Sequence, residues 1–284
     1  MRFYLSVIIL VITLSLGLFF GDISFGIIFQ ISEWVMILGI GISSFIISNP
    51  SSIFSQLVRE LPKVISEKPF SKTDYLTLLS FMFAFFKQSN SLTPAELEGQ
   101  IDNLENNPLC NKYPILLQHK SCMDFFKNYF RVLTFGFQDI YEIEYRMEAE
   151  IESRRIYMKR IIKSLNKLGD SFPAIGIIAA VLGVIGAMAS AGSSPEILGA
   201  RVAGALVGTF AGVFLAYCII NPFSSFIDKF QDAELAFLES MKVGMISYMK
   251  GYPVPISVEF ARQIISCDLQ PTFAEVENII YNVK

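Results

Sequence analysis

The 284-residue sequence has little charge. Asp, Glu, Lys and Arg together make up 17% of it, compared with about 25% in ordinary soluble domains. Hydrophobic residues make up 52%, and the mean hydropathy is +0.49. This composition excludes an ordinary soluble domain and indicates an integral membrane protein. The formal net charge of -3 offers no basic surface, so no nucleic acid partner is expected.

Residues that hold metals, disulfides or reacting groups are scarce as well. The sequence has one histidine, His119, and four scattered cysteines without a Cys-x-x-Cys pair. It therefore predicts no metal site, no cofactor and no disulfide framework. Phosphate-binding glycine loops and Gly-x-Ser-x-Gly turns are also missing, so we do not expect an enzyme.

Long apolar runs are what the sequence has instead. A helix of about 20 apolar residues crosses the ~30 Å hydrocarbon core of a bilayer. The runs predict an all-α integral membrane protein with four transmembrane helices and a helical cytoplasmic domain inserted between spans two and three. The predicted segments are spans 1–20, 34–49, 171–191 and 202–226, loops 21–33 and 192–201, the inserted domain 50–170 and the tail 227–284.

The distribution of cations predicts the orientation of the spans. Arg59, Lys63 and Lys72 follow the second run, whereas loop 21–33 holds no lysine or arginine. By the positive-inside rule the inserted domain is cytoplasmic, and four spans place both termini on that side.

Two helices are predicted within the inserted domain. Tyr75–Phe86 is apolar but too short to cross a membrane, which favours a buried helix. Glu142–Lys167 is rich in both signs of charge and predicts a long solvated helix that leads up to the third span.

Small residues recur at every fourth position in the last two spans. Residues four apart share a helix face, and in lipid small side chains let helix backbones approach closely. The stripes predict either packing between neighbouring helices of this chain or contact with a helix of another subunit. They are Ala179, Gly183, Ala187 and Ala191 in the third span and Ala200, Gly204, Gly208, Gly212 and Ala216 in the fourth.

The interiors of the predicted spans hold no Asp, Glu, Lys or Arg. Ion carriers normally place an ionisable residue there, so a partner would have to supply the titrating group if this protein moves ions. Thr209, Tyr217 and Asn221 are among the few polar groups there. The Thr209 hydroxyl could either bond back to the carbonyls of its own helix or line a narrow water path. Pro173 fits a harmless first-turn residue, whereas Pro222 interrupts a continuing apolar pattern and predicts a kink or hinge.

Three stretches together resemble the MotA family of flagellar motor stator proteins. They are LGDSFPAIGIIAAVLGVI (168–185), VGTFAGVFLAY (207–217) and GYPVPISVEFAR (251–262), and the resemblance covers essentially the whole chain. It implies a homo-oligomeric ring, a pentamer, around helices of a MotB-like partner whose aspartate carries the proton. It also implies an inner-membrane protein whose cytoplasmic domain pushes on the rotor protein FliG.

The resemblance further implies roles for residues of the spans. Pro173 and Pro222 match the two functional prolines of the family, and Thr209 matches a hydroxyl residue near the ion path. Ala180 stands where sodium-driven relatives carry threonine. Alanine offers no oxygen ligand to a dehydrated cation, so this position implies a proton-driven protein.

The rotor-facing charges match the family only in part. Glu98 matches the glutamate of the family's loop, but Asn90 stands where the family has arginine. Lys87 is the nearest cation and could act as a point charge, without the planar fork of arginine.

Two other functions stay open on the sequence. A TolQ/ExbB-like energiser of an envelope transport system would also use a partner's aspartate, but such proteins typically have three spans. A self-contained secondary transporter would need a charge or a broken helix of its own inside the membrane.

Overall fold

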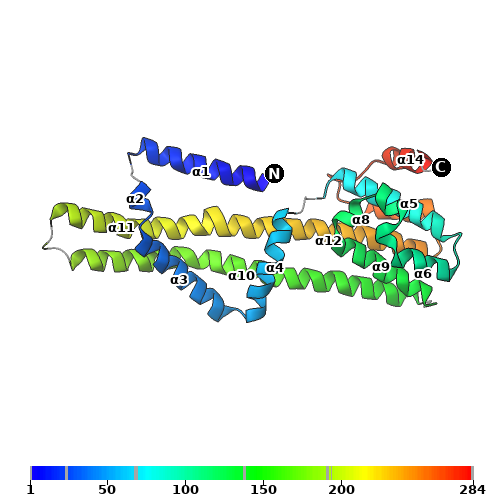
Figure 1. Cartoon of the computed structure of the whole chain (residues 1–284), viewed down its shortest axis with the longest axis horizontal. Helices are drawn as coiled ribbons and strands as arrows, with labels where there is room; N and C mark the ends of the chain where they lie inside the picture. Colours follow the sequence, from blue (N-terminus) through cyan, green and yellow to red (C-terminus); the bar gives the residue numbers. More distant parts are fainter. Residues whose placement is uncertain are drawn as a thin grey trace. The chain divides into compact units, whose positions relative to one another are not determined.

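The computed structural model of the protein describes residues 2–22, 25–66, 70–136, 139–189, 192 and 194–282 (Figure 1). The chain divides into two units, which we describe separately. Residues up to 67 together with 157–229 form one, called here the span unit, and residues 68–156 with 230–284 form the other, called here the aromatic unit. The prediction for Ala191 lies outside the described residues.

The described part of the span unit is entirely helical. Prolines mark two of its helix boundaries. Asn49 is extended because it precedes Pro50, and Pro195 begins a helix with its φ already fixed. The helices are α1 (Arg2–Phe20), α2 (Phe25–Ile28), α3 (Ile31–Ser48), α4 (Ser51–Ser66), the second half of α10 (Ile140–Met188), α11 (Pro195–Phe214), the π-helix η2 (Leu215–Ile220) and the start of α12 (Asn221–Met249).

Among the described residues, three helices are long and apolar enough to cross a membrane. They are α3, α10 and the continuous helix Ile197–Met249, while α1 carries a shorter apolar stretch, Leu5–Phe20. The prediction of an all-helical membrane protein is thereby confirmed. The number of four spans stays a prediction.

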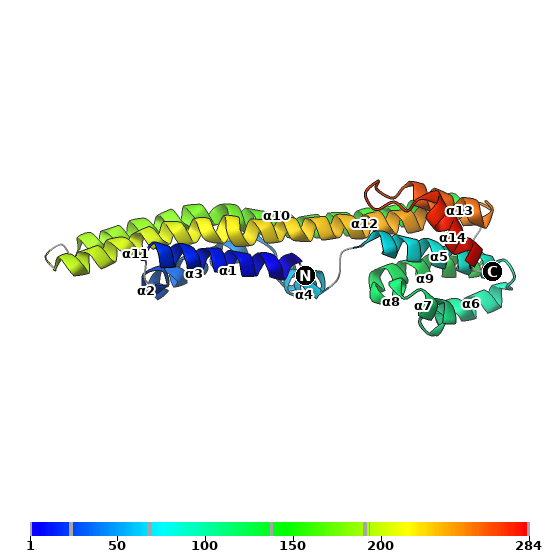
Figure 2. The same ribbon diagram turned by 90° about the horizontal axis from the view of Figure 1, so that it is seen from above.

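Helices α3, α10 and α11 pack together in the span unit. Figures 1 and 2 both show α11 running along the second half of α10, with α3 close to the pair. The ring of Phe172 on α10 contacts Gly41 on α3, where an added Cβ would lie 2.8 Å from it. The buried core residues are Ile37, Phe172, Ile175, Ala179, Ala211, Leu215 and Ala216. Small residues dominate the α11 side of this core, which lets the helix backbones approach.

The long helices continue past the predicted boundaries. α10 runs for 49 residues without interruption, so the predicted polar helix and the third span form one helix, and the boundary at residue 170 lies inside it. Likewise α11, η2 and α12 follow one another directly to Met249, beyond the predicted end of the fourth span at residue 226.

The aromatic unit is built around α5 (Lys72–Ser89). Every residue from Leu78 to Phe86 is buried, which confirms the buried helix predicted over Tyr75–Phe86. A capping box between Ser71 and Asp74 begins α5. The other elements are α6 (Pro94–Asp102), the 3-10 helix η1 (Leu104–Asn106), α7 (Pro108–Lys112), α8 (Ile115–Gln118), α9 (Lys120–Thr134), the first half of α10, the end of α12, α13 (Val254–Gln263) and α14 (Phe273–Asn282).

Aromatic rings from α5 and α9 interlock at the centre of this unit. The ring centroid of Phe126 lies 5.1 Å from that of Phe81 and 5.0 Å from that of Phe85, in edge-to-face geometry. Phe130 lies 5.0 Å from Phe85 in the same geometry. Edge-to-face pairs place the positive rim of one ring against the negative face of the next. The core therefore has a defined geometry in addition to its buried area.

Candidate ion pathway and partner surfaces

Glycines bring α10 and α11 into backbone contact. A Cβ added at Gly176 would lie 2.7 Å from the carbonyl oxygen of Gly208. A Cβ added at Gly212 would lie 2.5 Å from the carbonyl oxygen of Phe172. Neither position can hold a side chain without moving a backbone, so the two helices are held at the closest approach that glycine allows.

Several members of the small-residue stripes pack against helices of the same chain. Gly183 faces Ala205, whose Cβ would lie 2.8 Å from a Cβ at Gly183. Gly204 lies against the side chain of Gln30, which occupies the space that a Cβ would need. Ala200, at the start of its stripe, is exposed.

Glu33 departs from the prediction. It was expected in loop 21–33, but α3 begins at Ile31 and the Glu33 side chain is buried, with only 6% of the residue exposed. A Cβ added at Gly208 would lie 3.1 Å from Glu33 Oε2 and 3.1 Å from the backbone nitrogen of Ala180. The predicted loop bound at residue 33 is therefore wrong, because the first turn of α3 includes Glu33 and packs against α11.

Pro173 lies in the interior of α10, far beyond its first turn. The first-turn interpretation is wrong because the helix begins at Ile140. Proline has no N–H to donate to the carbonyl of Gly169, four residues earlier, and its ring crowds that carbonyl. α10 therefore lacks one backbone hydrogen bond at this level and bends there more easily.

Pro222 occupies the second position of α12, directly after the π-helix η2. The wider π-turn leaves room for a proline ring that would crowd the preceding turn of an α-helix. Proline and π-turns are the usual causes of helix kinks. The helix is thus irregular at the place where the sequence predicts a kink or hinge.

Gly169 and Asn221 connect the two proline sites. The Asn221 side chain fills the space that a Cβ at Gly169 would need, and Asn221 Nδ2 lies 3.5 Å from Asp170 Oδ1. Asn221 Oδ1 is buried and has no hydrogen-bond partner among the described residues. The weakened segments of α10 and α12 therefore contact each other at one level of the span unit.

Thr209 and Tyr217 have unused hydroxyl groups. Neither hydroxyl hydrogen-bonds to any residue that the structure describes, so Thr209 does not bond back to its own helix. Thr209 is half-buried beside Gly208, whereas 62% of Tyr217 is exposed. Ala180, also half-buried, lies on α10 next to Gly208. Both hydroxyls are available to water or to a partner.

An exposed apolar line runs along the other side of α11 and η2. Its members are spaced by three or four residues, so they share one helix face. They are Leu206, Phe210, Val213 and Tyr217. This line and the buried glycine stripe give α11 one face turned to its own chain and one left open.

Lys87, Asn90 and Glu98 lie on the α5–α6 segment of the aromatic unit. Asn90 follows the end of α5, and its Oδ1 accepts a hydrogen bond from the Tyr248 hydroxyl at 2.9 Å. Lys87 and Glu98 are exposed, and neither forms an ion pair or hydrogen bond within the described part of the chain. The Asn90 side chain therefore bonds within the chain, whereas the charges of Lys87 and Glu98 are available to a partner.

The sequence interpretation missed the roles of Glu33, Gln30 and Asn221. A signal for Glu33 was present, because residues 33, 37, 41 and 45 recur at four-residue spacing and all four are buried on α3. Continuing the stripe backward from Ile37 would have placed Glu33 inside the helix. No comparable signal marks Gln30 or Asn221, whose partners come from other helices.

Apolar helices in backbone contact, irregular at two prolines, define a multi-pass helical membrane protein. Residues 5–92 match the family model described as Motility protein A N-terminal, and residues 118–240 match that of the MotA/TolQ/ExbB proton channel family. Motility protein A of Escherichia coli K12 is 34% identical over 92% of this chain and 88% of its own. The chain belongs to the MotA family of these proton channels.

Two solved structures share the fold over nearly the whole chain. The structure of C. jejuni MotAB matches with a TM-score of 0.76 and 18% identity, covering 93% of this chain and 95% of that chain. The flagellar MotAB stator complex from Bacillus subtilis matches with a TM-score of 0.68 and 19% identity, covering 97% and 98%. Because the family consists of channels, the expectation that the chain is not an enzyme is confirmed.

Proposed function

We propose that this chain is the proton-conducting stator subunit of a bacterial flagellar motor and converts proton flow into torque on the rotor. The observation that carries the proposal is the 34% identity to Motility protein A over 92% of the chain. A motility protein matched at almost full length favours this function over the TolQ/ExbB-like energiser. The family of proton channels also agrees with Ala180, which offers no oxygen ligand to sodium.

A MotB-like subunit completes the channel in this proposal and supplies the aspartate that carries the proton. The MotAB structures that share the fold support such a partner. The exposed line on α11 and η2 is the surface we assign to a partner helix, because a lipid-facing line needs no Tyr217 hydroxyl. Several copies of the chain, five in our proposal, surround the partner.

Pro173 and Pro222 couple proton passage to movement in this proposal. Both lie in helices that are easier to bend at that level, and Gly169 and Asn221 hold the two segments in contact. Pro173→Ala and Pro222→Ala restore a helix-compatible residue and stiffen the bend. We expect swimming to be lost while membrane insertion and partner binding persist, measured by tethered-cell rotation and co-purification. Normal torque in either variant would remove that proline from the coupling.

Rotor contact is assigned to the free charges of the α5–α6 segment, with FliG as the partner. Glu98→Lys should weaken stator recruitment, and the defect should depend on ionic strength because exposed charges are screened by salt. Glu277→Lys reverses another exposed carboxylate, on α14, and is the matched control. Equal recruitment of the two variants, counted as fluorescent stators at the motor, would leave Glu98 outside the contact.

The remaining parts of the proposal concern orientation. We propose four spans in the bacterial inner membrane, with the N- and C-termini in the cytoplasm. Reporter fusions at the N-terminus, at Asp22 and after Asn282 should report inside, outside and inside, respectively. An N-terminus outside the membrane would favour a three-span energiser.

The function is tested by motility. The chain is expressed with a MotB-like partner in cells that lack both stator proteins, and rotation is recorded with and without sodium and with a protonophore. Rotation that needs no sodium and stops with protonophore is the expected result. Rotation that requires sodium would keep the stator and reject the inference from Ala180. No rotation by an assembled pair would reject the stator function.

A further inference from the structure

Glu33 is the only acidic side chain buried within the described residues. Only 6% of it is exposed, and its Oε2 atom has no hydrogen-bond partner in that part of the chain. The two buried serines of the span unit, Ser164 and Ser224, have partners. Ser164, for example, donates to Asn49 Oδ1 at 2.7 Å. A buried carboxyl group left without any partner therefore needs an explanation.

Along the helix axis, the Glu33 carboxyl group lies at a level far from the ends of the apolar pair α10–α11. Its Oε2 and the backbone nitrogen of Ala180 would each lie 3.1 Å from a Cβ at Gly208, and Ala180 is near the middle of the apolar run 171–191. Figures 1 and 2 show that the α2–α3 corner meets α11 part-way along its length, and that both α10 and α11 extend beyond it. The carboxyl group is therefore flanked by apolar helix on both sides along the axis.

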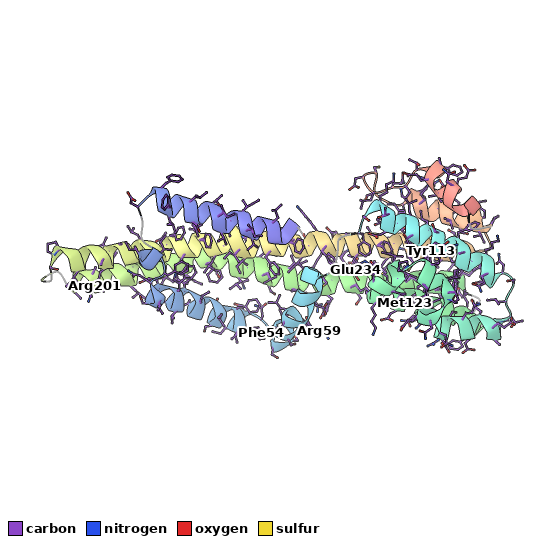
Figure 3. The ribbon with its side chains drawn as sticks, turned by 45° about the horizontal axis from the view of Figure 1, so that its top comes forward. Phe54, Arg59, Tyr113, Met123, Arg201 and Glu234 are labelled. Atoms are coloured by element: carbon purple, nitrogen blue, oxygen red, sulfur yellow. The ribbon has the colours of Figure 1, made fainter. Side chains whose placement is uncertain are left out.

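Within the residues that the structure describes, no cation lies beside the carboxyl group of Glu33. Glu33 is the only ionisable residue of α3, and the α10 segment from 171 to 188 has none. α11 carries Glu196 and Arg201 near its start, about two turns or more before Gly208. Arg201 lies toward the α10–α11 turn (Figure 3), and its guanidinium donates to the carbonyl of Gly186 at 2.8 Å.

The glycine stripe provides room for polar side chains from the α2–α3 corner. Gln30 fills the space beside Gly204, and Glu33 lies beside Gly208, one turn further along α11. A larger residue at either glycine would displace the polar side chain beside it, because a Cβ at Gly208 would already lie 3.1 Å from Glu33 Oε2.

We propose that Glu33 is a second proton-binding site of this protein, in addition to the acid of the partner. The proposal rests on the stator function above. A buried carboxylate without a counter-ion is costly, whereas the neutral acid is not. A proton from water forms the O–H bond on Glu33. The same bond then breaks as the proton returns to water, and no electrons are transferred.

The experiment compares Glu33→Gln with Asp22→Asn in the complete complex, in cells without other stators. Glutamine keeps the shape and the hydrogen-bonding capacity of the site but cannot carry a proton. Asp22→Asn removes an exposed charge nearby, at a left-handed position (φ +49°) that asparagine tolerates. The parent pair must rotate in the same cells. If the parent does not rotate, the stator function fails; if only the variant differs from the parent, the result concerns Glu33.

We expect Glu33→Gln to assemble normally, to lower rotation speed several-fold and to flatten the dependence of speed on external pH. Asp22→Asn should match the parent. Parent-like speed and pH dependence in Glu33→Gln would show that the carboxyl is only a packing or hydrogen-bonding group, which would overturn the proposal.

A second measurement covers the case in which Glu33→Gln does not assemble. Infrared difference spectra of the purified parent complex, taken at several pH values, report the carbonyl band of a protonated carboxyl group. The intensity of the band should change with pH, and this pH dependence should shift in Glu33→Asp, which keeps an ionisable group. A Glu33 band that does not change with pH, or a spectrum that Glu33→Asp leaves unaltered, would overturn the proposal.

Discussion

Helices pack against one another in both units, but the residues at their contacts differ in size, from glycine in one unit to phenylalanine in the other. In the span unit, helices meet at Gly176, Gly208 and Gly212, where backbone touches backbone. In the aromatic unit, they meet through rings such as Phe85 and Phe126, which are completely buried. A single helix, α10, contributes to both units. The kind of residue at its contacts, and not the helix itself, therefore distinguishes the two.

The surroundings that we propose for each unit, lipid for the span unit and water for the aromatic unit, account for the difference. In water, burying apolar surface is worth about 25 cal/mol per Å², so large rings stabilise a core strongly. Lipid is itself apolar, so that gain is absent and association depends on close van der Waals contact. Glycine and alanine supply such contact because they leave no side chain between the backbones.

The two units also differ in whether a buried ionisable side chain has a partner of opposite charge. Lys242 of the aromatic unit is buried, yet it pairs with Glu148 and, at 2.6 Å, with Glu239. Burial by itself lowers the pKa of Lys242, but the hydrogen bonds to the two glutamates outweigh it and raise the pKa above its usual value. Glu33 of the span unit has no such partner. A paired charge holds structure together, whereas the unpaired one is available to a proton.

The largest expected effect comes from removing a ring. Phe126→Ala should destabilise the aromatic unit by about 3–5 kcal/mol, because it leaves a cavity between α5 and α9. Hydrogen exchange of the purified complex should show lost protection in α5 and α9 while α11 is unaffected. Phe135→Ala, at a position that is 70% exposed, is the control. Equal loss of protection in both units would contradict the conclusion that the rings stabilise the aromatic unit specifically.

Gly176→Ala tests the contrasting mode of packing. The added methyl group meets the carbonyl of Gly208 at 2.7 Å and should cost roughly 1–3 kcal/mol by forcing α10 and α11 apart. Gly186→Ala is the control on the same helix, since nothing lies within 4 Å of its added carbon. Thermal unfolding in detergent measures both. Equal stability of the two variants would mean that backbone contact does not hold the span unit.

Lys242→Met tests how much the ion pairs of this buried lysine contribute to stability. The change leaves Glu148 and Glu239 without their shared cation, and we expect a loss of roughly 1–2 kcal/mol, reduced by solvent because Glu148 is largely exposed. Lys120→Met, at an exposed position, should have no effect. A methionine variant as stable as the parent would show that the buried cation contributes only packing.

The smallest expected effect is the pH dependence of α14. The hydrogen bond from Lys72 lowers the pKa of Glu275 from 4.5 to about 2. A lowered pKa in the folded state means that the stabilisation is present above pH 4.5 and is lost as the pH falls toward 2. Hydrogen exchange in α14 should therefore quicken in acid, and Glu275→Gln should remove this dependence. Identical pH profiles would exclude the pair as the anchor of α14.

Much of the fold could be predicted from local patterns. Apolar length identified the membrane helices, and the short run Tyr75–Phe86 was correctly expected to be buried. Proline was harder to interpret, because Pro173 fits a helix start when only neighbouring residues are considered. The 49-residue length of α10 is what places it in a helix interior.

The sequence by itself determined an all-helical membrane protein, its glycine stripes and its family, because these depend on composition, on four-residue spacing and on motifs along the chain. The tertiary structure decided which residues meet. Gly169 meets Asn221, Asn90 accepts from Tyr248, and Glu33 lies against Gly208. Burial and contact between distant segments depend on how helices pack, and spacing along one helix carries no information about the facing one.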